Sequence, residues 1–447
     1  MKRMFGTDGI RGVAGTPPLD PATVRAFGAA LAEVLAESGA PSPRVVVGRD
    51  TRESGPWIRD AVAEGLAFRG AVAMDAGVIT TPGLAFAAHA GLFDAGVMIS
   101  ASHNPFADNG LKVFGRDGVK IADEIEARVE ALILDRSHPA PPTSGARAAI
   151  DTSLVARYVA YLESAVPAGR FAGLRLLLDC ANGAAFELAP RVYRHLGAEV
   201  GTIGDAPDGR NINLGCGSLH LDELASRVVA SGADLGLAFD GDADRCLAVD
   251  RRGRVVDGDH ILFLAGRSLK RRGALLGDAV VATVMSNFWL EKRLADEGIR
   301  LHRAPVGDKY VLERMVAEDA VLGGEQSGHV IFRSRSTTGD GILTGLLLLD
   351  TLRDEAEPLE AILDGIVPYP QVLVNVRVRE KPDLRAHAAV GPVVAEAERE
   401  IEGRGRVVLR YSGTEPLARV MVEADDGDLV RALADRLAGA IRTAIGV

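Results

Sequence analysis

The feature that most constrains the fold of this chain is a recurring unit, in which a short apolar run leads into a polar turn and then into a helical segment. The unit occurs at 96–105, 174–183 and 280–287. Apolar runs bounded by turn residues indicate buried strands, and strands that alternate with helices indicate a mostly parallel sheet. Open α/β sheets bind ligands at the carboxyl ends of their strands, so these polar turns are the first candidates for a functional site.

The chain is too long for a single hydrophobic core, since 447 residues correspond to about three or four domains. A Pro-rich segment that ends at residue 145 is the first predicted linker. Beyond Pro368 the pattern changes to period-2 alternation over 371–379, followed by a helix with an apolar stripe from Leu429 to Ile441. We predict three similar α/β domains with mixed, mostly parallel sheets and a smaller C-terminal α+β domain, at 1–145, 146–255, 256–367 and 368–447.

Composition excludes several classes of protein. The net charge of -10 argues against broad nucleic-acid binding, although a local arginine cluster could still hold an anionic substrate. Cys180, Cys216 and Cys246 lie far apart and form no zinc framework, which indicates reduced thiols in a cytoplasmic protein. We find no apolar leader and no apolar segment long enough to span a bilayer, so no membrane partner is expected.

Ser102 lies in the tract Ser-Ala-Ser-His-Asn-Pro, directly after the predicted strand that ends at Ile99. A serine held at a strand end beside His103 can act as a nucleophile or as a phosphoryl carrier. Serine, asparagine and proline are also common turn residues, so a capped turn is the alternative. The tract by itself leaves both interpretations open.

Asp240, Asp242 and Asp244 alternate directly after the predicted buried strand 235–239. Three crowded carboxylates repel one another unless a positive charge lies between them, and a hard divalent cation with oxygen ligands meets that need. A calcium EF-hand would require Gly at the sixth position and Glu at the twelfth, where this chain has Arg245 and Arg251. The spacing therefore predicts a metal site, with Mg²⁺ preferred if a phosphate shares it.

Glu325, Ser327 and His329 follow a short apolar stretch. A carboxylate, a hydroxyl and an imidazole together can bind sugar hydroxyls, which need several directional hydrogen bonds. The alternative is a polar hairpin turn, and the three residues alone do not decide between the two.

Arg410, Ser412, Gly413 and Thr414 offer a guanidinium, two hydroxyls and a small backbone, and Arg419 could add a second guanidinium. Such a set suits a phosphate group. A glycine hairpin stabilised by hydroxyls is the alternative.

Two further signals are weaker. The segment 5–12 carries Thr7 and Arg11 among glycines and could bring backbone N–H groups and a guanidinium to an anion, although a plain glycine turn is the favoured interpretation. Lys112 is a candidate general acid or base, whereas an isolated lysine is usually a solvated surface residue.

Four of these segments occur in the order of the motif blocks of the α-D-phosphohexomutase superfamily, which the chain resembles along its whole length. The blocks are Ser-Ala-Ser-His-Asn-Pro, Asp-Gly-Asp-Ala-Asp-Arg, Gly-Glu-Gln-Ser-Gly-His and Arg-Tyr-Ser-Gly-Thr-Glu-Pro. Residues 5–12, 306–311 and Gln326 resemble most the bacterial branch that acts on glucosamine phosphate, since relatives that act on mannose or glucose phosphates usually have Met at the position of Gln326. The resemblance implies four domains around a central cleft.

The resemblance also implies roles for individual residues. Ser102 would carry a phosphoryl group, and one Mg²⁺ per chain would be bound by Ser102, Asp240, Asp242 and Asp244. Lys112 matches the general acid or base of the family, His329 is a weaker candidate, and His103 and Arg245 would support the phosphoserine. The implied substrate-binding residues are Thr7, Arg11, Arg245, Lys309, Glu325, Ser327, Arg410, Ser412, Gly413, Thr414 and Arg419.

The implied reaction interconverts glucosamine 6-phosphate and glucosamine 1-phosphate. Glucosamine 1,6-bisphosphate is the implied intermediate and activator. The implied role of the reaction is to supply amino-sugar nucleotides and peptidoglycan precursors. A mutase of the same fold that acts on glucose or mannose phosphates is the nearest alternative, and a metal-dependent phosphatase is a more distant one. A non-enzymatic sugar-phosphate binder has no need of a serine beside three aspartates. The implied partner is a small sugar phosphate, and the chain is compatible with a homodimer.

Overall fold

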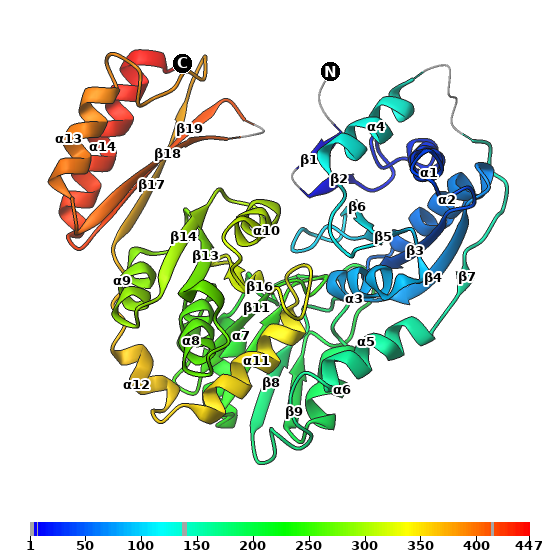
Figure 1. Cartoon of the computed structure of the whole chain (residues 1–447), viewed down its shortest axis with the longest axis horizontal. Coiled ribbons are helices and arrows are strands. Elements are labelled where there is room, and N and C mark those ends of the chain that lie inside the picture. The colour runs from blue at the N-terminus through cyan, green and yellow to red at the C-terminus, as the bar shows by residue number, and fades with distance from the viewer. Residues whose placement is uncertain (1–3, 7, 136–140, 413–414) are drawn as a thin grey trace. The chain divides into compact units, whose positions relative to one another are not determined.

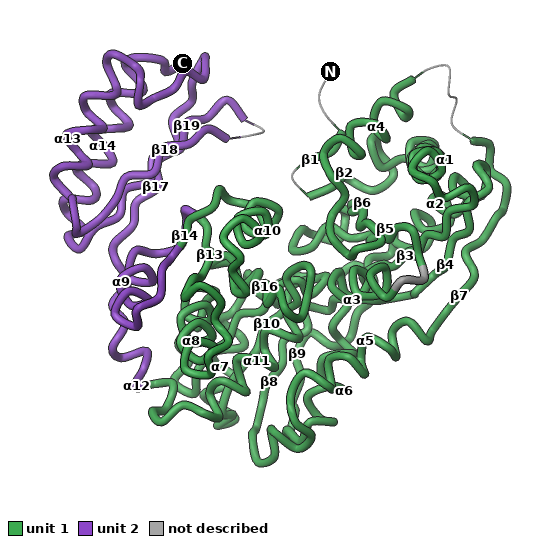
Figure 2. Tube along the Cα trace, in the orientation of Figure 1, with its two compact units in different colours: residues 1–283, 302–360 green, residues 284–301, 361–447 purple. Residues whose placement is uncertain are grey.

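The computed structural model describes residues 4–6, 8–135, 141–412 and 415–447. It divides the chain into two compact units, drawn in green and purple in Figure 2. Unit 1 comprises residues 1–283 and 302–360, and unit 2 comprises residues 284–301 and 361–447.

The first sheet of unit 1 contains seven strands. In spatial order they are β1 (Phe5–Gly6), β2 (Gly9–Val13), β6 (Asp108–Gly115), β5 (Ala95–Ile99), β3 (Arg44–Arg49), β4 (Val72–Val78) and β7 (Ala149–Ile150) (Figure 1). The four strands from β5 to β7 run parallel, whereas β6 returns antiparallel beside β5 and sets Lys112 opposite Met98. The helical segments are α1 (Pro21–Glu37), α2 (Gly55–Phe68), α3 (Thr81–Ala87), the π-helical turn η1 (Ala88–Leu92) and α4 (Asp123–Leu134).

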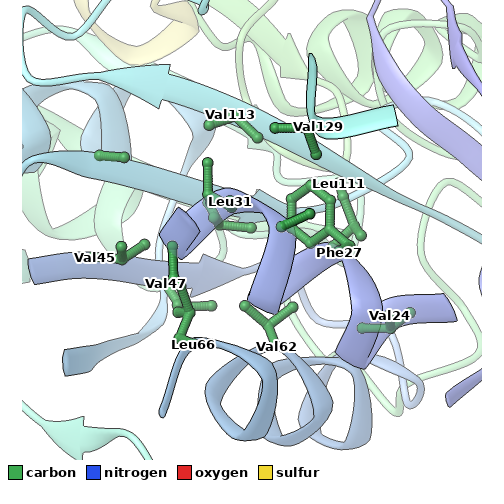
Figure 3. Close-up of a cluster of buried hydrophobic side chains, with 14 of the residues drawn as sticks. Val24, Phe27, Leu31, Val45, Val47, Val62, Leu66, Leu111, Val113 and Val129 are labelled. Atoms are coloured by element: carbon green, nitrogen blue, oxygen red, sulfur yellow. The ribbon is translucent and has the colours of Figure 1, made fainter. Parts of the chain in front are cut away.

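A hydrophobic core packs this sheet against α1 and α2, and Figure 3 draws part of it, with Phe27 of α1 beside Leu111 of β6 and with Leu31 of α1 on the side of Val45 and Val47 of β3. The two helices approach closely because Gly65 has no side chain: a Cβ there would lie 2.1 Å from the carbonyl oxygen of Arg25. The core fixes β3 and β5, and with them the turns that leave their carboxyl ends.

The second sheet of unit 1 has five strands. Their order is β12 (Val255–Val256), β11 (Cys246–Asp250), β10 (Leu235–Phe239), β8 (Arg175–Asp179) and β9 (Glu199–Ile203). β8, β9 and β10 run parallel, and β11 and β12 are antiparallel additions. The helices of this region are α5 (Ser153–Glu163), α6 (Leu188–His195) and α7 (Asp222–Ser231).

A four-stranded sheet follows, in the order β14 (Arg300–Ala304), β13 (Ala279–Thr283), β15 (Leu322–Gly324) and β16 (Val330–Phe332). β13 and β15 are parallel, and β16 is antiparallel to β15. The helical segments are α8 (Gly258–Arg271), the 3-10 turn η2 (Leu276–Asp278), α9 (Phe288–Asp296), α10 (Asp308–Ala317) and α11 (Gly341–Asp354).

The last sheet belongs to unit 2 and is wholly antiparallel, in the order β17 (Gln371–Arg377), β19 (Leu417–Ala424) and β18 (Gly405–Tyr411). Its helices are α12 (Leu359–Asp364), whose first two residues fall in unit 1, α13 (Gly391–Glu400) and α14 (Gly427–Ile445). Leu433, Leu437 and Ile441 of α14 are fully buried in the core of this unit, as their regular spacing predicts.

The predicted fold class is confirmed: three regions have mixed sheets with parallel centres, and a smaller antiparallel sheet with helices ends the chain. The four predicted domain ranges stay a prediction. No helix in the described parts of the chain has both the length and the apolar character needed to cross a membrane.

Candidate active site

Ser102 lies three residues beyond β5, and its side chain reaches the loop that follows β10. Its Oγ donates a 2.6 Å hydrogen bond to Oδ2 of Asp240, a residue 138 positions away in the chain. Nδ1 of His103 lies 3.3 Å from the same Oγ. Ser102 is 1% exposed, and its backbone adopts a φ of +52°. The predicted phosphoryl carrier therefore meets the predicted metal loop directly.

Asp50 and Ser100 position Ser102, and neither of them is among the residues predicted from the sequence to form the site. Ser100 Oγ donates to Asp50 Oδ2 at 2.7 Å and accepts the backbone N–H of Ser102 at 2.9 Å. The sequence does contain a signal for Asp50, because this residue lies in a polar turn directly after the buried strand 44–48. Since β3 and β5 are parallel neighbours, their following turns meet at one edge of the sheet.

Asp240, Asp242 and Asp244 are all buried, and each offers a carboxylate oxygen within 4.8 Å of the others. Burial, reinforced by Asp244 and Asp242, raises the pKa of Asp240 well above its ordinary value. Oδ1 of Asp242 and Oδ1 of Asp244 have no hydrogen-bond partner among the described residues. A cluster of buried carboxylates with unused oxygens can bind a metal ion, and its all-oxygen donor set fits Mg²⁺.

Lys112 faces the same aspartates from β6. Its Nζ lies 2.9 Å from Asp242, 3.1 Å from Asp8 and 3.5 Å from Asp244. Burial favours the neutral amine, but these three carboxylates outweigh it and raise the pKa of Lys112 well above its ordinary value. The side chain is therefore a buried ammonium, not the solvated surface lysine of the alternative interpretation. An ammonium is suited to balance negative charge and to donate a proton.

A chain of ion pairs continues from Asp8 to the start of α10. Lys120 bridges the carboxylates of Asp8 and Asp308, and Nε2 of His329 lies 3.8 Å from Asp308. Arg11 pairs with Asp8 and also donates to the carbonyl oxygen of Ala101 at 3.2 Å. Asp8, Lys120 and Asp308 were absent from the predicted site, because their local sequence gives no sign that they converge.

His103 and Arg245 both lie beside the serine and the aspartates. Burial, aided by Arg245 and Arg11, lowers the pKa of His103 to about 4, so the imidazole is neutral near pH 7. Nε of Arg245 lies 4.0 Å from Asp240 and 3.8 Å from Asp244. His103 thus contacts Ser102 itself, and Arg245 lies beside the aspartate that Ser102 contacts; their role in supporting a phosphoserine stays a prediction.

The predicted sugar-binding residues contact one another in the turn between β15 and β16. Ser327 Oγ donates to Glu325 at 3.2 Å, and Glu325 also accepts the N–H of Gly307 at 2.9 Å. Neither ring nitrogen of His329 has a hydrogen-bond partner among the described residues. The Gln326 side chain points elsewhere, since its Nε2 donates to Asp257 at 3.1 Å, at the N-terminus of α8. Gln326 thus anchors the turn to α8.

Lys309, another predicted substrate-binding residue, forms an ion pair with Asp123. Both residues line a cavity of about 550 Å³ in unit 1, together with Lys120 and Asp308. Ser102 and the three aspartates do not line this cavity. The structure therefore gives Lys309 a partner outside the immediate surroundings of Ser102.

Three further predicted residues, Arg410, Ser412 and Arg419, lie in unit 2. Arg410 on β18 and Arg419 on β19 are cross-strand partners. Burial and the adjacent Arg419 lower the pKa of Arg410, and Nη2 of Arg419 lies 3.7 Å from a carboxylate oxygen of Glu415. Ser412 is buried at the end of β18, and its Oγ accepts the N–H of Glu415 at 3.3 Å. Such an arrangement suits a phosphate group. Thr7, Gly413 and Thr414 lie outside the described residues.

A buried serine that is hydrogen-bonded to one of three clustered aspartates, within an α/β fold of this kind, is typical of an enzyme of phosphoryl transfer. Four phosphoglucomutase/phosphomannomutase family models match the chain: α/β/α domain I at residues 2–139, domain II at 156–253, domain III at 257–369 and the C-terminal domain at 373–440. The chain belongs to the phosphoglucomutase/phosphomannomutase family.

Individual relatives share most of the sequence. The phosphoglucosamine mutase of Solibacter usitatus is 51% identical over 446 residues, which cover 100% of this chain and 99% of the relative. That of Symbiobacterium thermophilum is 49% identical over 444 residues, or 99% of each chain. A phosphoglucomutase/phosphomannomutase family protein of Burkholderia thailandensis has a similar structure, with a TM-score of 0.81, 25% identity and 100% of both chains covered. Aspergillus fumigatus N-acetylphosphoglucosamine mutase, solved with GlcNAc-6P and magnesium, shares the fold at a TM-score of 0.66 and 20% identity, over 99% of this chain and 96% of that chain.

Proposed function

We propose that this chain interconverts glucosamine 6-phosphate and glucosamine 1-phosphate by way of a phosphoryl group carried on Ser102. The observation that carries the proposal is the 2.6 Å contact between Ser102 Oγ and Asp240 within the buried aspartate cluster. The choice of an amino sugar is supported by the relatives named phosphoglucosamine mutase, which match the chain over its full length.

The reaction has two half-reactions that mirror each other. In the first, the bond between Ser102 Oγ and phosphorus breaks while the free sugar oxygen bonds to that phosphorus and loses its proton. The products are the sugar 1,6-bisphosphate and an unmodified serine, which takes up a proton. In the second, Ser102 Oγ loses its proton and bonds to the other phosphorus of the bisphosphate, while the bond from that phosphorus to the sugar oxygen breaks. The sugar oxygen takes up a proton, and the isomeric monophosphate is released. Bisphosphate that escapes between the two steps would have to rebind, so added bisphosphate is an expected activator.

The surrounding residues have separate roles in this scheme. The Lys112 ammonium balances negative charge at the reacting phosphoryl group and can donate a proton to the departing oxygen. His103, neutral near pH 7, can accept the Ser102 proton through Nδ1. A Mg²⁺ ion held by the three aspartates and the phosphoserine would neutralise charge on the moving phosphoryl group.

The sugar itself is held by groups that do not react. Glu325 and Ser327 bind sugar hydroxyls. The bisphosphate intermediate turns end over end between the two half-reactions, and in either orientation it offers these two residues a similar pattern of hydroxyls. Arg410, Ser412 and Arg419 bind the phosphate that is not being transferred, which uses the paired positive charges on β18 and β19.

Glucosamine phosphate is expected to be preferred over glucose and mannose phosphates by at least about tenfold in kcat/KM. The amine at C2 is largely cationic near neutral pH, and pairing it with a carboxylate or carbonyl would gain a charge-assisted hydrogen bond of about 1.5–3 kcal/mol. The measurement is a coupled assay of all three sugar phosphates under the same Mg²⁺ and bisphosphate. Faster turnover of glucose or mannose 1-phosphate would reject the substrate assignment and leave the Ser102 mechanism intact, whereas net release of inorganic phosphate would favour a phosphatase.

Arg419→Gln is expected to raise KM for the sugar phosphate by about tenfold to a hundredfold, because the variant loses a charge-assisted hydrogen bond to the phosphate. Arg404→Gln is the matched control: Arg404 immediately precedes β18, and its guanidinium pairs with Asp425 on the surface. The measurement is the KM for the sugar phosphate in both variants by steady-state kinetics, and Arg404→Gln should keep the wild-type KM. An unchanged KM in Arg419→Gln would remove this arginine from the phosphate site.

A further inference from the structure

We propose that Asn213 is a positioning residue that holds the turn of Ser102 in the conformation needed for phosphoryl transfer. The proposal rests on the proposed role of Ser102 as the phosphoryl carrier. Nδ2 of Asn213 donates to the carbonyl oxygen of Ser102 at 2.9 Å and to that of Asn104 at 3.1 Å. Asn213 is 111 residues away from Ser102 in sequence, in the loop that follows β9.

The same two carbonyl oxygens have a second donor on another element. Nη2 of Arg52 donates to Ser102 at 2.9 Å and to Asn104 at 2.8 Å. Arg52 is 1% exposed and forms a 2.9 Å ion pair with Asp50 in the turn after β3. Arg52 therefore binds the serine turn from the first sheet, which also carries Ser102. Asn213 binds the same turn from the second sheet, which carries the aspartates.

The turn needs such support because Ser102 has a φ of +52°, in the left-handed region that non-glycine residues avoid. The backbone conformation of Ser102 sets the direction of its Cα–Cβ bond, and hence the position of Oγ relative to Asp240. Gly241 approaches the same carbonyl so closely that a Cβ there would lie 2.6 Å from the Ser102 oxygen. Without the bonds from Asn213, the turn could relax and move Oγ off the aspartate cluster.

Asn213 is itself held firmly in place. Its backbone N–H donates to the carbonyl of Ala181 at 2.8 Å, and Asp179 accepts the N–H groups of Ala181 at 2.9 Å and Gly217 at 2.7 Å. Asp179 ends β8, which lies beside β10, the strand that leads into the aspartates. The Asn213 amide and the Asp240 carboxylate thus belong to one rigid sheet edge, and they contact Ser102 through its carbonyl and its hydroxyl respectively.

The test compares Asn213→Gly with Asn211→Gly. Glycine accepts the φ of +57° that Asn213 adopts, so the substitution removes the amide without adding backbone strain. Asn211 lies in the same loop, and its Nδ2 also donates to a backbone carbonyl, that of Ala206 at 2.9 Å, but not to the serine turn. Asn213→Asp is a second variant that keeps the size and loses the donor. For each variant we would measure Tm, KM, kcat and the rate at which phosphorylated enzyme transfers its phosphoryl group to substrate in a single turnover.

Both Asn213 variants are expected to lower kcat and the single-turnover rate by about tenfold to a hundredfold, because a misplacement of about 1 Å at the reacting atom has effects of this size. KM should stay within about twofold of the wild-type value and Asn211→Gly should keep near wild-type rates. Wild-type protein whose Ser102 accepts no phosphoryl group would overturn the proposed function, and the role of Asn213 with it. Two outcomes would overturn this inference alone, provided that the wild-type protein is phosphorylated on Ser102. One is a single-turnover rate of Asn213→Gly equal to that of Asn211→Gly, and the other is a loss of rate that only follows the fall in Tm.

Discussion

Replacement of Ser102 by alanine is expected to remove nearly all turnover, a loss of about a thousandfold or more, as is usual when a catalytic nucleophile is deleted. The reason is that the variant has no oxygen to accept a phosphoryl group, while the sugar-binding and phosphate-binding residues are unchanged. Intact-protein mass spectrometry should detect a phosphate on part of the purified wild-type protein, and peptide mapping should locate it on Ser102. The same mass should be absent from Ser102→Ala.

Ser100→Ala is the matched control for this experiment. Ser100 is also buried in the turn, but its hydroxyl is engaged with Asp50 and with the backbone of Ser102. The control should retain the phosphate, even if its turnover is reduced by a less ordered turn. A Ser102→Ala enzyme with near-normal activity, or a phosphate that maps to Ser100, would end the assignment of Ser102 as the carrier.

Removal of the divalent metal is expected to abolish turnover, and added Mg²⁺ should restore it. Asp242→Asn should weaken Mg²⁺ binding by at least about tenfold, since changes even outside the ligand shell commonly have effects of this size. The physical reason is that the neutral amide replaces one of three crowded, buried carboxylates that a divalent cation would neutralise. Titration calorimetry with Mg²⁺ measures the binding directly, apart from any assay of activity.

Asp234→Asn is a suitable control, because Asp234 immediately precedes β10, at the opposite end of that strand from the aspartate cluster, and accepts the backbone N–H of Arg175. Its Mg²⁺ affinity should equal that of the wild-type protein. Full activity in excess chelator would show that the aspartate cluster is not a catalytic metal site.

The local sequence was sufficient for the strands, the polar turns and the fold class. Apolar runs such as 235–239 specify a buried strand by their composition, and the acids that follow must then lie at its carboxyl end. The apolar stripe of α14 specified its buried face in the same way. In these cases the information lies within one element, so a short window of sequence contains it.

The tertiary structure alone decided which of these turns meet. The relative placement of separate sheets in unit 1 brings Ser102 to Asp240, sets the Asn213 amide on the carbonyl of Ser102, and joins Asp8 to Asp308 through Lys120. Each of these contacts depends on the relative placement of elements more than 100 residues apart. Long-range pairing of this kind arises from the packing of whole sheets and helices, and no local pattern of residues encodes it.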